Sequence, residues 1–195
     1  MKIEGVKQSG DSEMITVVLD ANVLYPMLLR DTLLRCAAAG LFQIRWSSKI
    51  LEEMTSNLVR DYGMPAEAAD ALRQIMDEAF PEAMVDGWEE LEPAMRNDSK
   101  DRHVAAAAAA SGAVAIVTAN TRDFYDLPAG IDAAHPDEFL CALFNATPSK
   151  VGDVLHRQAS GYRRPTLTTA ELLARLAVIT PNFARIVLEH LNEEG

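Results

Sequence analysis

Four acidic residues of this chain stand where side chains of a parallel sheet can do chemistry: Asp20, Glu53, Asp101 and Asp123. Asp20 directly follows the apolar, β-branched run 15–19, which is typical of a strand buried on both faces. Ligands of open α/β sheets bind beyond the carboxyl ends of such strands. The position of Asp20 therefore predicts a functional carboxylate.

The other three acids also follow or begin regular elements. Asp123 falls in the turn 119–124, directly after a second apolar run. Glu53 and Asp101 fall in the early turns of expected helices. We expect these acids to converge on one crevice at the carboxyl edge of the sheet.

Carboxylates that stand close together repel one another unless a cation lies between them. Hard oxygen ligands of this kind suit Mg²⁺ or Mn²⁺, as one or two ions, whereas no Cys and His spacing typical of zinc is present. Such an ion lowers the pKa of a bound water and stabilises charge on a phosphoryl group. The acids thus favour phosphodiester hydrolysis, although Asp20 and Asp101 could also cap helices, and His103 is more simply a packing residue.

Alternating strand and helix patterns predict a three-layer α/β/α fold around a central parallel, doubly wound sheet of 4–5 strands, with a C-terminal helical extension. Strands are expected at 15–19, 42–46, 113–118 and 130–134, and helices at 26–39, 49–60, 65–80, 136–144, 151–158, 168–178 and 181–191, besides the helix of the alanine run 105–110. The expected domains are a disordered leader at 1–14, a catalytic domain at 15–146 and the helical extension at 147–195.

The net charge of −11 is unevenly distributed. Residues 1–149 carry 12 Lys and Arg against 24 Asp and Glu, whereas residues 150–195 carry 6 against 5. An acidic protein is a poor non-specific ligand of nucleic acid, so RNA binding would need metal ions and a local basic patch. Candidate RNA-binding residues are Arg122, Arg157, Arg163 and Arg164.

The chain lacks a signal-peptide pattern and an apolar run long enough to span a membrane, which predicts a cytoplasmic protein. Its two cysteines, Cys36 and Cys141, lie far apart and are expected to be buried thiols.

Four blocks of the chain resemble the sequence blocks of PIN domains, in the family's order. They are Leu19-Asp20-Ala21-Asn22-Val23, Ile50-Leu51-Glu52-Glu53-Met54, Lys100-Asp101-Arg102-His103-Val104-Ala105-Ala106-Ala107 and Val117-Thr118-Ala119-Asn120-Thr121-Arg122-Asp123-Phe124. The resemblance covers roughly residues 15–144 and implies a Mg²⁺- or Mn²⁺-dependent ribonuclease, commonly the VapC toxin of a type II toxin–antitoxin pair. It also implies an RNA substrate, a cognate antitoxin that masks the crevice, and a homodimer.

The same resemblance assigns roles to single residues. The family's first three acids match Asp20, Glu53 and Asp101, while its fourth position falls on Asn120 or, three residues later, on Asp123. We favour Asp123 as the charged member. Polar support for water, phosphate or substrate is expected from Asn22, Ser47 and Asn120.

Two other classes of protein are weighed against this interpretation. A non-catalytic PIN-like module would bind RNA or protein without cutting, although it has little reason to assemble three acids. An aspartate-based phosphotransfer protein of the haloacid-dehalogenase type needs a second aspartate two residues after the first, where this chain has Asn22.

Overall fold

Four short segments of the chain form a parallel sheet, two of them apolar runs, and helical segments fill the intervals between them. The computed structural model describes residues 14–193. The expected leader at 1–14, apart from the exposed Met14, lies outside these described residues.

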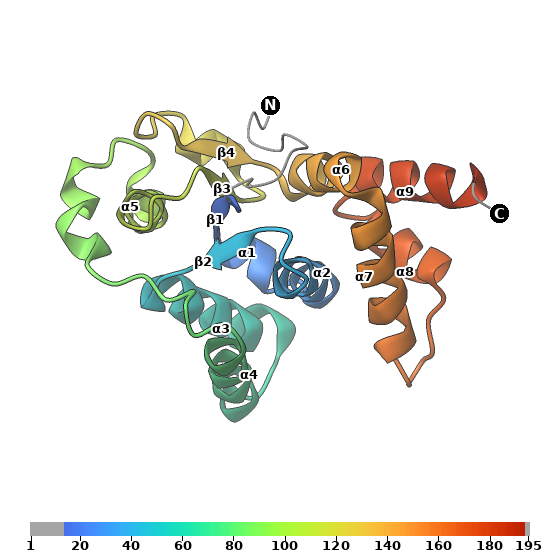
Figure 1. Cartoon of the computed structure of the whole chain (residues 1–195). Coiled ribbons are helices and arrows are strands. Elements are labelled where there is room, and N and C mark those ends of the chain that lie inside the picture. The colour runs from blue at the N-terminus through green and yellow to red at the C-terminus, as the bar shows by residue number, and fades with distance from the viewer. Residues whose placement is uncertain (1–13, 194–195) are drawn as a thin grey trace. The chain divides into compact units, whose positions relative to one another are not determined.

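Contacts within the chain divide it into two compact units (Figure 1). The first, here called the sheet unit, comprises Ile15–Pro26 and Gln43–Ala134. The second, the helical unit, comprises Met27–Phe42 and the chain from His135 onward. Residues 27–42 and 135–146 thus cluster with the C-terminal helices, and the domain boundary expected after residue 146 stays a prediction.

The sheet unit is built on four strands in the order β2-β1-β3-β4, and every pairing among them is parallel. The strands are β1 (Thr16–Leu19), β2 (Gln43–Arg45), β3 (Ala115–Val117) and β4 (Asp132–Ala134). Val18 pairs with Arg45 on one side and with Ile116 on the other, so β1 is an inner strand. The expected α/β fold with a central parallel sheet and C-terminal helices is confirmed.

Helices and short 3₁₀ turns complete the sheet unit. They are α1 (Ala21–Leu24), α3 (Ser48–Tyr62), α4 (Ala66–Ala79), η1 (Trp88–Glu90), η2 (Glu92–Ala94), η3 (Ser99–Asp101), α5 (Arg102–Ala110) and η4 (Thr121–Phe124). Figure 1 shows α3 and α4 side by side, where they pack on each other. The helix expected at 26–39 is observed as α2, which begins at Met27, whereas the short helix α1 directly after Asp20 was not expected.

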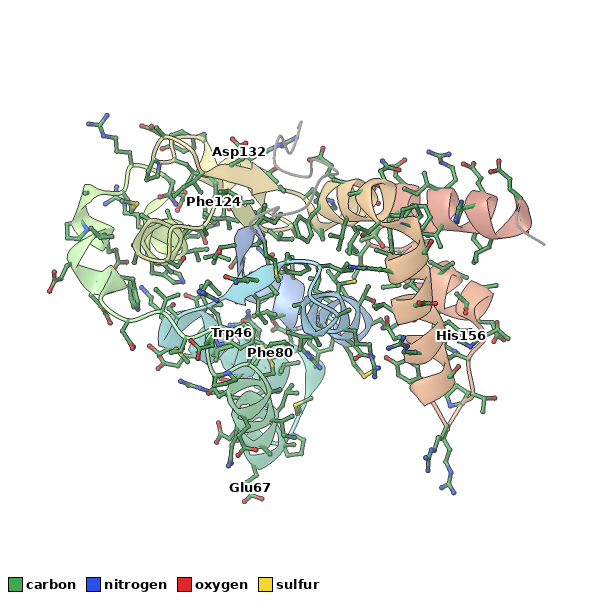
Figure 2. All side chains as sticks on the ribbon, in the orientation of Figure 1. Trp46, Glu67, Phe80, Phe124, Asp132 and His156 are labelled. Atoms are coloured by element: carbon green, nitrogen blue, oxygen red, sulfur yellow. The ribbon has the colours of Figure 1, made fainter. Side chains whose placement is uncertain are left out.

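Beyond β2, Trp46 extends the sheet by one isolated parallel bridge to Met84. The Trp46 amide donates to the Ala83 carbonyl, and the Val85 amide donates to the Trp46 carbonyl. The fully buried Trp46 ring meets the Phe80 ring edge to face at 5.9 Å between centroids (Figure 2). This packing fixes the chain just before α3, the helix that carries Glu53.

The small side chains of the alanine run let α5 pack closely against its neighbours. Four of them are fully buried: Ala105, Ala106, Ala107 and Ala108. The helix packs on β1 and β3 and leads through a short turn into β3. A helix that precedes a parallel strand and packs back on it begins at the strand's carboxyl end. The first residues of α5 are thereby placed at the edge where Asp20 lies.

The helical unit consists of α2 (Met27–Ala38), α6 (Pro136–Ala146), α7 (Pro148–Gly161), α8 (Thr169–Leu176) and α9 (Pro181–Glu193). A buried polar pair joins α2 to α7, where the Thr32 hydroxyl donates to Gln158 Oε1 at 2.8 Å. The Gln158 amide donates in turn to the Leu28 carbonyl. Because the donors and acceptors satisfy one another, both polar side chains can be fully buried.

None of the helices among residues 14–193 combines the length and the apolar character needed to cross a membrane.

Candidate functional site

Asp20 is held at the carboxyl end of β1 by hydrogen bonds from two directions. Its Oδ2 accepts from the Thr118 hydroxyl at 2.7 Å and from the Asn22 amide at 2.6 Å. Its side chain makes no capping hydrogen bond to α1, and only 4% of the residue is exposed. The carboxylate is therefore oriented by neighbouring side chains rather than used as a helix cap.

Thr118 organises this corner, and the sequence alone did not single it out. Its hydroxyl accepts from the Asn22 amide at 2.9 Å and from the backbone amide of Asn120 at 3.1 Å. Asn22 Oδ1 accepts in addition from the Ala119 amide. The sequence signal that could have identified Thr118 is its place as a polar residue directly after the buried apolar strand β3, which pairs with β1. Of the three expected polar supports, Asn22 therefore contacts Asp20 through its side chain, whereas Asn120 contacts Thr118 through its backbone amide.

Asp101 and Asp123 share a lysine. Lys100 Nζ lies 2.9 Å from Asp123 Oδ2 and 3.8 Å from Asp101 Oδ2. The backbone brings the two acids together, because the Asp98 amide donates to the Asp123 carbonyl. Asp98 caps the η3 turn through the Lys100 amide, so Asp101 is not held in a capping box.

The surroundings of Asp101 disfavour its ionised form. Its Oδ2 is buried and has no hydrogen-bond partner among the described residues. Burial raises the pKa of Asp101 to about 6, and the negative charge of Asp20 adds to the rise. Burial likewise raises the pKa of Asp20, where the Thr118 hydrogen bond opposes the rise and the Glu53 charge adds to it.

Glu53 reaches this region from α3. Its side chain is 40% exposed, and its Oε2 lies 3.2 Å from His103 Nε2. Ser47 begins the same helix: it is fully buried, and its hydroxyl accepts from the Ile50 amide. The structure thus places Ser47 as the N-cap that fixes where α3 starts, and Glu53 as the acid that α3 presents.

The structure therefore brings Asp20, Glu53 and Asp101 within electrostatic reach of one another, and Lys100 links Asp101 to Asp123. Within residues 14–193, no three Asp, Glu, His or Cys side chains already form a group that could hold a metal ion. The donor chemistry nevertheless fits a hard divalent cation, since the available atoms are carboxylate oxygens and the buried Asp101 Oδ2 has no hydrogen-bond partner among the described residues.

The four candidate RNA-binding arginines are all exposed but belong to different units. Arg122 lies on η4 of the sheet unit. Arg157 lies on α7 of the helical unit, and Arg163 and Arg164 follow that helix.

The parallel four-stranded sheet with its surrounding helices is consistent with a PIN domain. Residues 16–122, more than half of the chain, match the PIN domain family, and the chain belongs to it. Residues 136–189 match a second family, the VapC50 C-terminal domain. The resemblance to VapC-like PIN proteins is thereby confirmed.

A relative of known sequence is the "Putative ribonuclease VapC50" of Mycobacterium tuberculosis (strain ATCC 25618 / H37Rv). It is 38% identical to this chain over 101 residues, which are 50% of this chain and 60% of the relative. The chain thus matches less than two thirds of that protein's length. No solved structure matches the chain significantly.

Proposed function

We propose that this PIN-family chain is a metal-dependent endoribonuclease that hydrolyses RNA phosphodiester bonds and serves as the toxin of a type II toxin–antitoxin pair. The observation that carries the proposal is the fixed Asp20 carboxylate with Glu53 and Asp101 within electrostatic reach. Family membership and the name of the relative, a putative ribonuclease, point the same way.

Asp20, Glu53, Asp101 and Asp123 would hold one or two Mg²⁺ or Mn²⁺ ions. When bound, such an ion supplies the positive charge that activates a water and stabilises the phosphoryl oxygens. Thr118 and Asn22 keep Oδ2 of Asp20 in one orientation, so little reorganisation is needed on binding. Lys100 offers an ammonium beside Asp101 and Asp123 that a phosphate could reach, because its side chain is 61% exposed.

The partners follow from the same proposal. The exposed Arg122, Arg157, Arg163 and Arg164 would contact the RNA backbone. A cognate antitoxin would mask the acidic crevice by offering a basic side chain to its carboxylates. The protein would act as a homodimer, as PIN domains commonly do.

A non-catalytic module that binds RNA or protein is the second candidate. One observation favours it: the described side chains do not already form a metal-binding group. The two functions differ in a measurable way, since only the nuclease would cleave RNA, and it would need a divalent ion to do so.

The deciding experiment compares cleavage of a structured RNA pool by the wild type, Asp20→Ala and Asp101→Asn, with Mg²⁺, with Mn²⁺ and with EDTA, after any co-purified partner has been stripped. We expect cleavage by the wild type only with metal, and a loss of at least 100-fold in both variants, since each loses a metal-holding carboxylate. Asp126→Asn, an exposed acid of the same unit, is the matched control and should cut like the wild type. A wild type that binds RNA but cuts nothing would establish the binding module instead.

A further inference from the structure

His103 is a buried imidazole that has no role in the proposed metal-dependent cleavage described above. It lies in the first turn of α5, two residues after Asp101, and none of its surface is exposed. Neither ring nitrogen has an aligned hydrogen-bond partner within the part of the chain that the structure describes. A buried nitrogen without a partner is costly, so its surroundings need explaining.

Trp88 and Glu53 define these surroundings. The Trp88 ring, itself 6% exposed, meets the imidazole edge to face at 6.1 Å between centroids. On another side Glu53 Oε2 lies 3.2 Å from Nε2, which is within hydrogen-bond distance although the pair is not aligned. The imidazole cannot move far between Trp88 and α5, whereas the half-exposed Glu53 side chain can rotate to complete the bond.

Glu53 needs such a partner because it has the longest and most exposed side chain of the proposed ligands. A glutamate on a helix has three side-chain torsions, and its side chain here is 40% exposed. The negative charge of Asp20 repels it from the place where both would have to meet. A fixed donor on the α5 side would hold the carboxylate near Asp20 before a cation arrives.

We propose that His103 is a positioning residue, whose Nε2–H holds the Glu53 carboxylate in place for the divalent ion. The role rests on the proposed metal-dependent function and deepens it. His103 acts through Glu53 and touches neither ion nor RNA. Groups that orient metal-holding side chains commonly change metal affinity by 10- to 100-fold when they are removed.

The test measures Mn²⁺ binding by calorimetry in two variants that differ in reach. His103→Gln places an amide nitrogen near the former Nε2, whereas His103→Asn reaches only to the former Nδ1. Both replace an aromatic ring with an amide, so both should lower the melting temperature similarly. We expect His103→Asn to weaken Mn²⁺ binding about tenfold or more, and His103→Gln to stay within about threefold of the wild type.

A second measurement applies to the wild-type fold, in case His103→Asn does not fold. Addition of diamagnetic Mg²⁺ should shift the ring ¹⁵N resonances of His103 in the wild type, because binding of the ion to Glu53 alters the hydrogen bond between Glu53 and His103. The same addition to Glu53→Gln should leave these resonances in place. The chain has only 4 histidines, so the signals can be assigned.

The outcomes separate this inference from the function on which it rests. A wild type that binds neither Mn²⁺ nor Mg²⁺ overturns the proposed function and the inference together. Metal binding by the wild type that is equal in both His103 variants, or that falls equally in both along with the melting temperature, overturns the inference alone. The same holds for a His103 resonance that shifts alike in wild type and Glu53→Gln.

Discussion

Asp101 shows how the surroundings of one residue link stability to chemistry. Its folded-state pKa of about 6 lies above the ordinary value of 3.8, because burial and the Asp20 charge disfavour the ionised form. The folded state therefore binds more protons than the unfolded state between about pH 4 and pH 6. The ionised carboxylate consequently reduces stability, and this reduction grows as the pH rises through that window.

Asp101→Asn should accordingly stabilise the metal-free protein at neutral pH while it abolishes cleavage. We expect the free energy of unfolding to rise by about 1 kcal/mol at pH 7.5 after allowance for solvent screening, which is a melting temperature higher by about 2–4 °C. Below pH 4 the two proteins should melt alike, because the carboxyl is then neutral in both states. Thermal denaturation of the wild type and Asp101→Asn in EDTA across this pH range measures the difference in melting temperature. An equal difference at both ends of the range would show that the charge is not the cause.

At the scale of elements, the N-terminus of α9 is held by a side chain from another helix. Asp137 of α6 is 5% exposed, and its carboxylate accepts from the Phe183 amide at 2.8 Å and from the Asn182 amide at 3.2 Å. The Asn182 side-chain amide adds a third hydrogen bond at 2.8 Å. These amides belong to the first turn of α9, where no intrahelical acceptor is available. One carboxylate therefore caps α9 and joins it to α6.

Asp137→Ala should destabilise the protein by about 2–3 kcal/mol, because three donors lose a charged acceptor and two of them are backbone amides of a helix start. The exposed neighbour Glu138 is the matched control, and Glu138→Ala should stay within about 0.5 kcal/mol of the wild type. Urea unfolding followed by circular dichroism measures both. Similar midpoints for the two variants would mean that the cap contributes little.

At the scale of the whole molecule, charge decides how an acidic chain could bind an anionic polymer. The net charge is −11, yet residues 150–195 are slightly basic and carry the exposed Arg157, Arg163 and Arg164. Each phosphate contact made by such a side chain releases condensed counterions, so it appears in the salt dependence of binding.

Arg163→Ala combined with Arg164→Ala should weaken RNA binding and flatten its salt dependence. In an Asp20→Ala background, which prevents cleavage, we expect the slope of log affinity against log salt to fall in magnitude by roughly 1–2. The slope is measured by fluorescence anisotropy of a labelled structured RNA between about 50 and 200 mM KCl, a range over which phosphate contacts change the affinity strongly. Arg175→Ala, at an exposed arginine of α8, is the control and should leave the slope unchanged. An unchanged slope in the double variant would remove these two arginines from the RNA-binding surface.

The sequence by itself determined the fold class and the placement of the acids along the chain. Apolar runs such as 15–19 and 113–118 predicted buried parallel strands, and local hydrophobic periodicity is sufficient for that because it reflects burial of each element. It also placed Asp20 at the end of a strand and Glu53 on a helix, as observed. The helix expected at 26–39 is observed as α2, whereas the four-residue helix α1 was missed, because so short a segment shows no hydrophobic period.

Only the tertiary structure decided which side chains meet. Thr118 reaches Asp20 across 98 positions of sequence because β3 pairs with β1 in the register that sets Val117 opposite Leu19. The Asp137 contacts with α9 likewise span 45 and 46 positions and follow from helix packing. Hydrogen-bond partners and raised pKa values depend on distance and burial in space, and local sequence patterns carry neither. For that reason the acids and Asn22 could be named in advance, while Thr118, which orients Asp20 together with Asn22, could not.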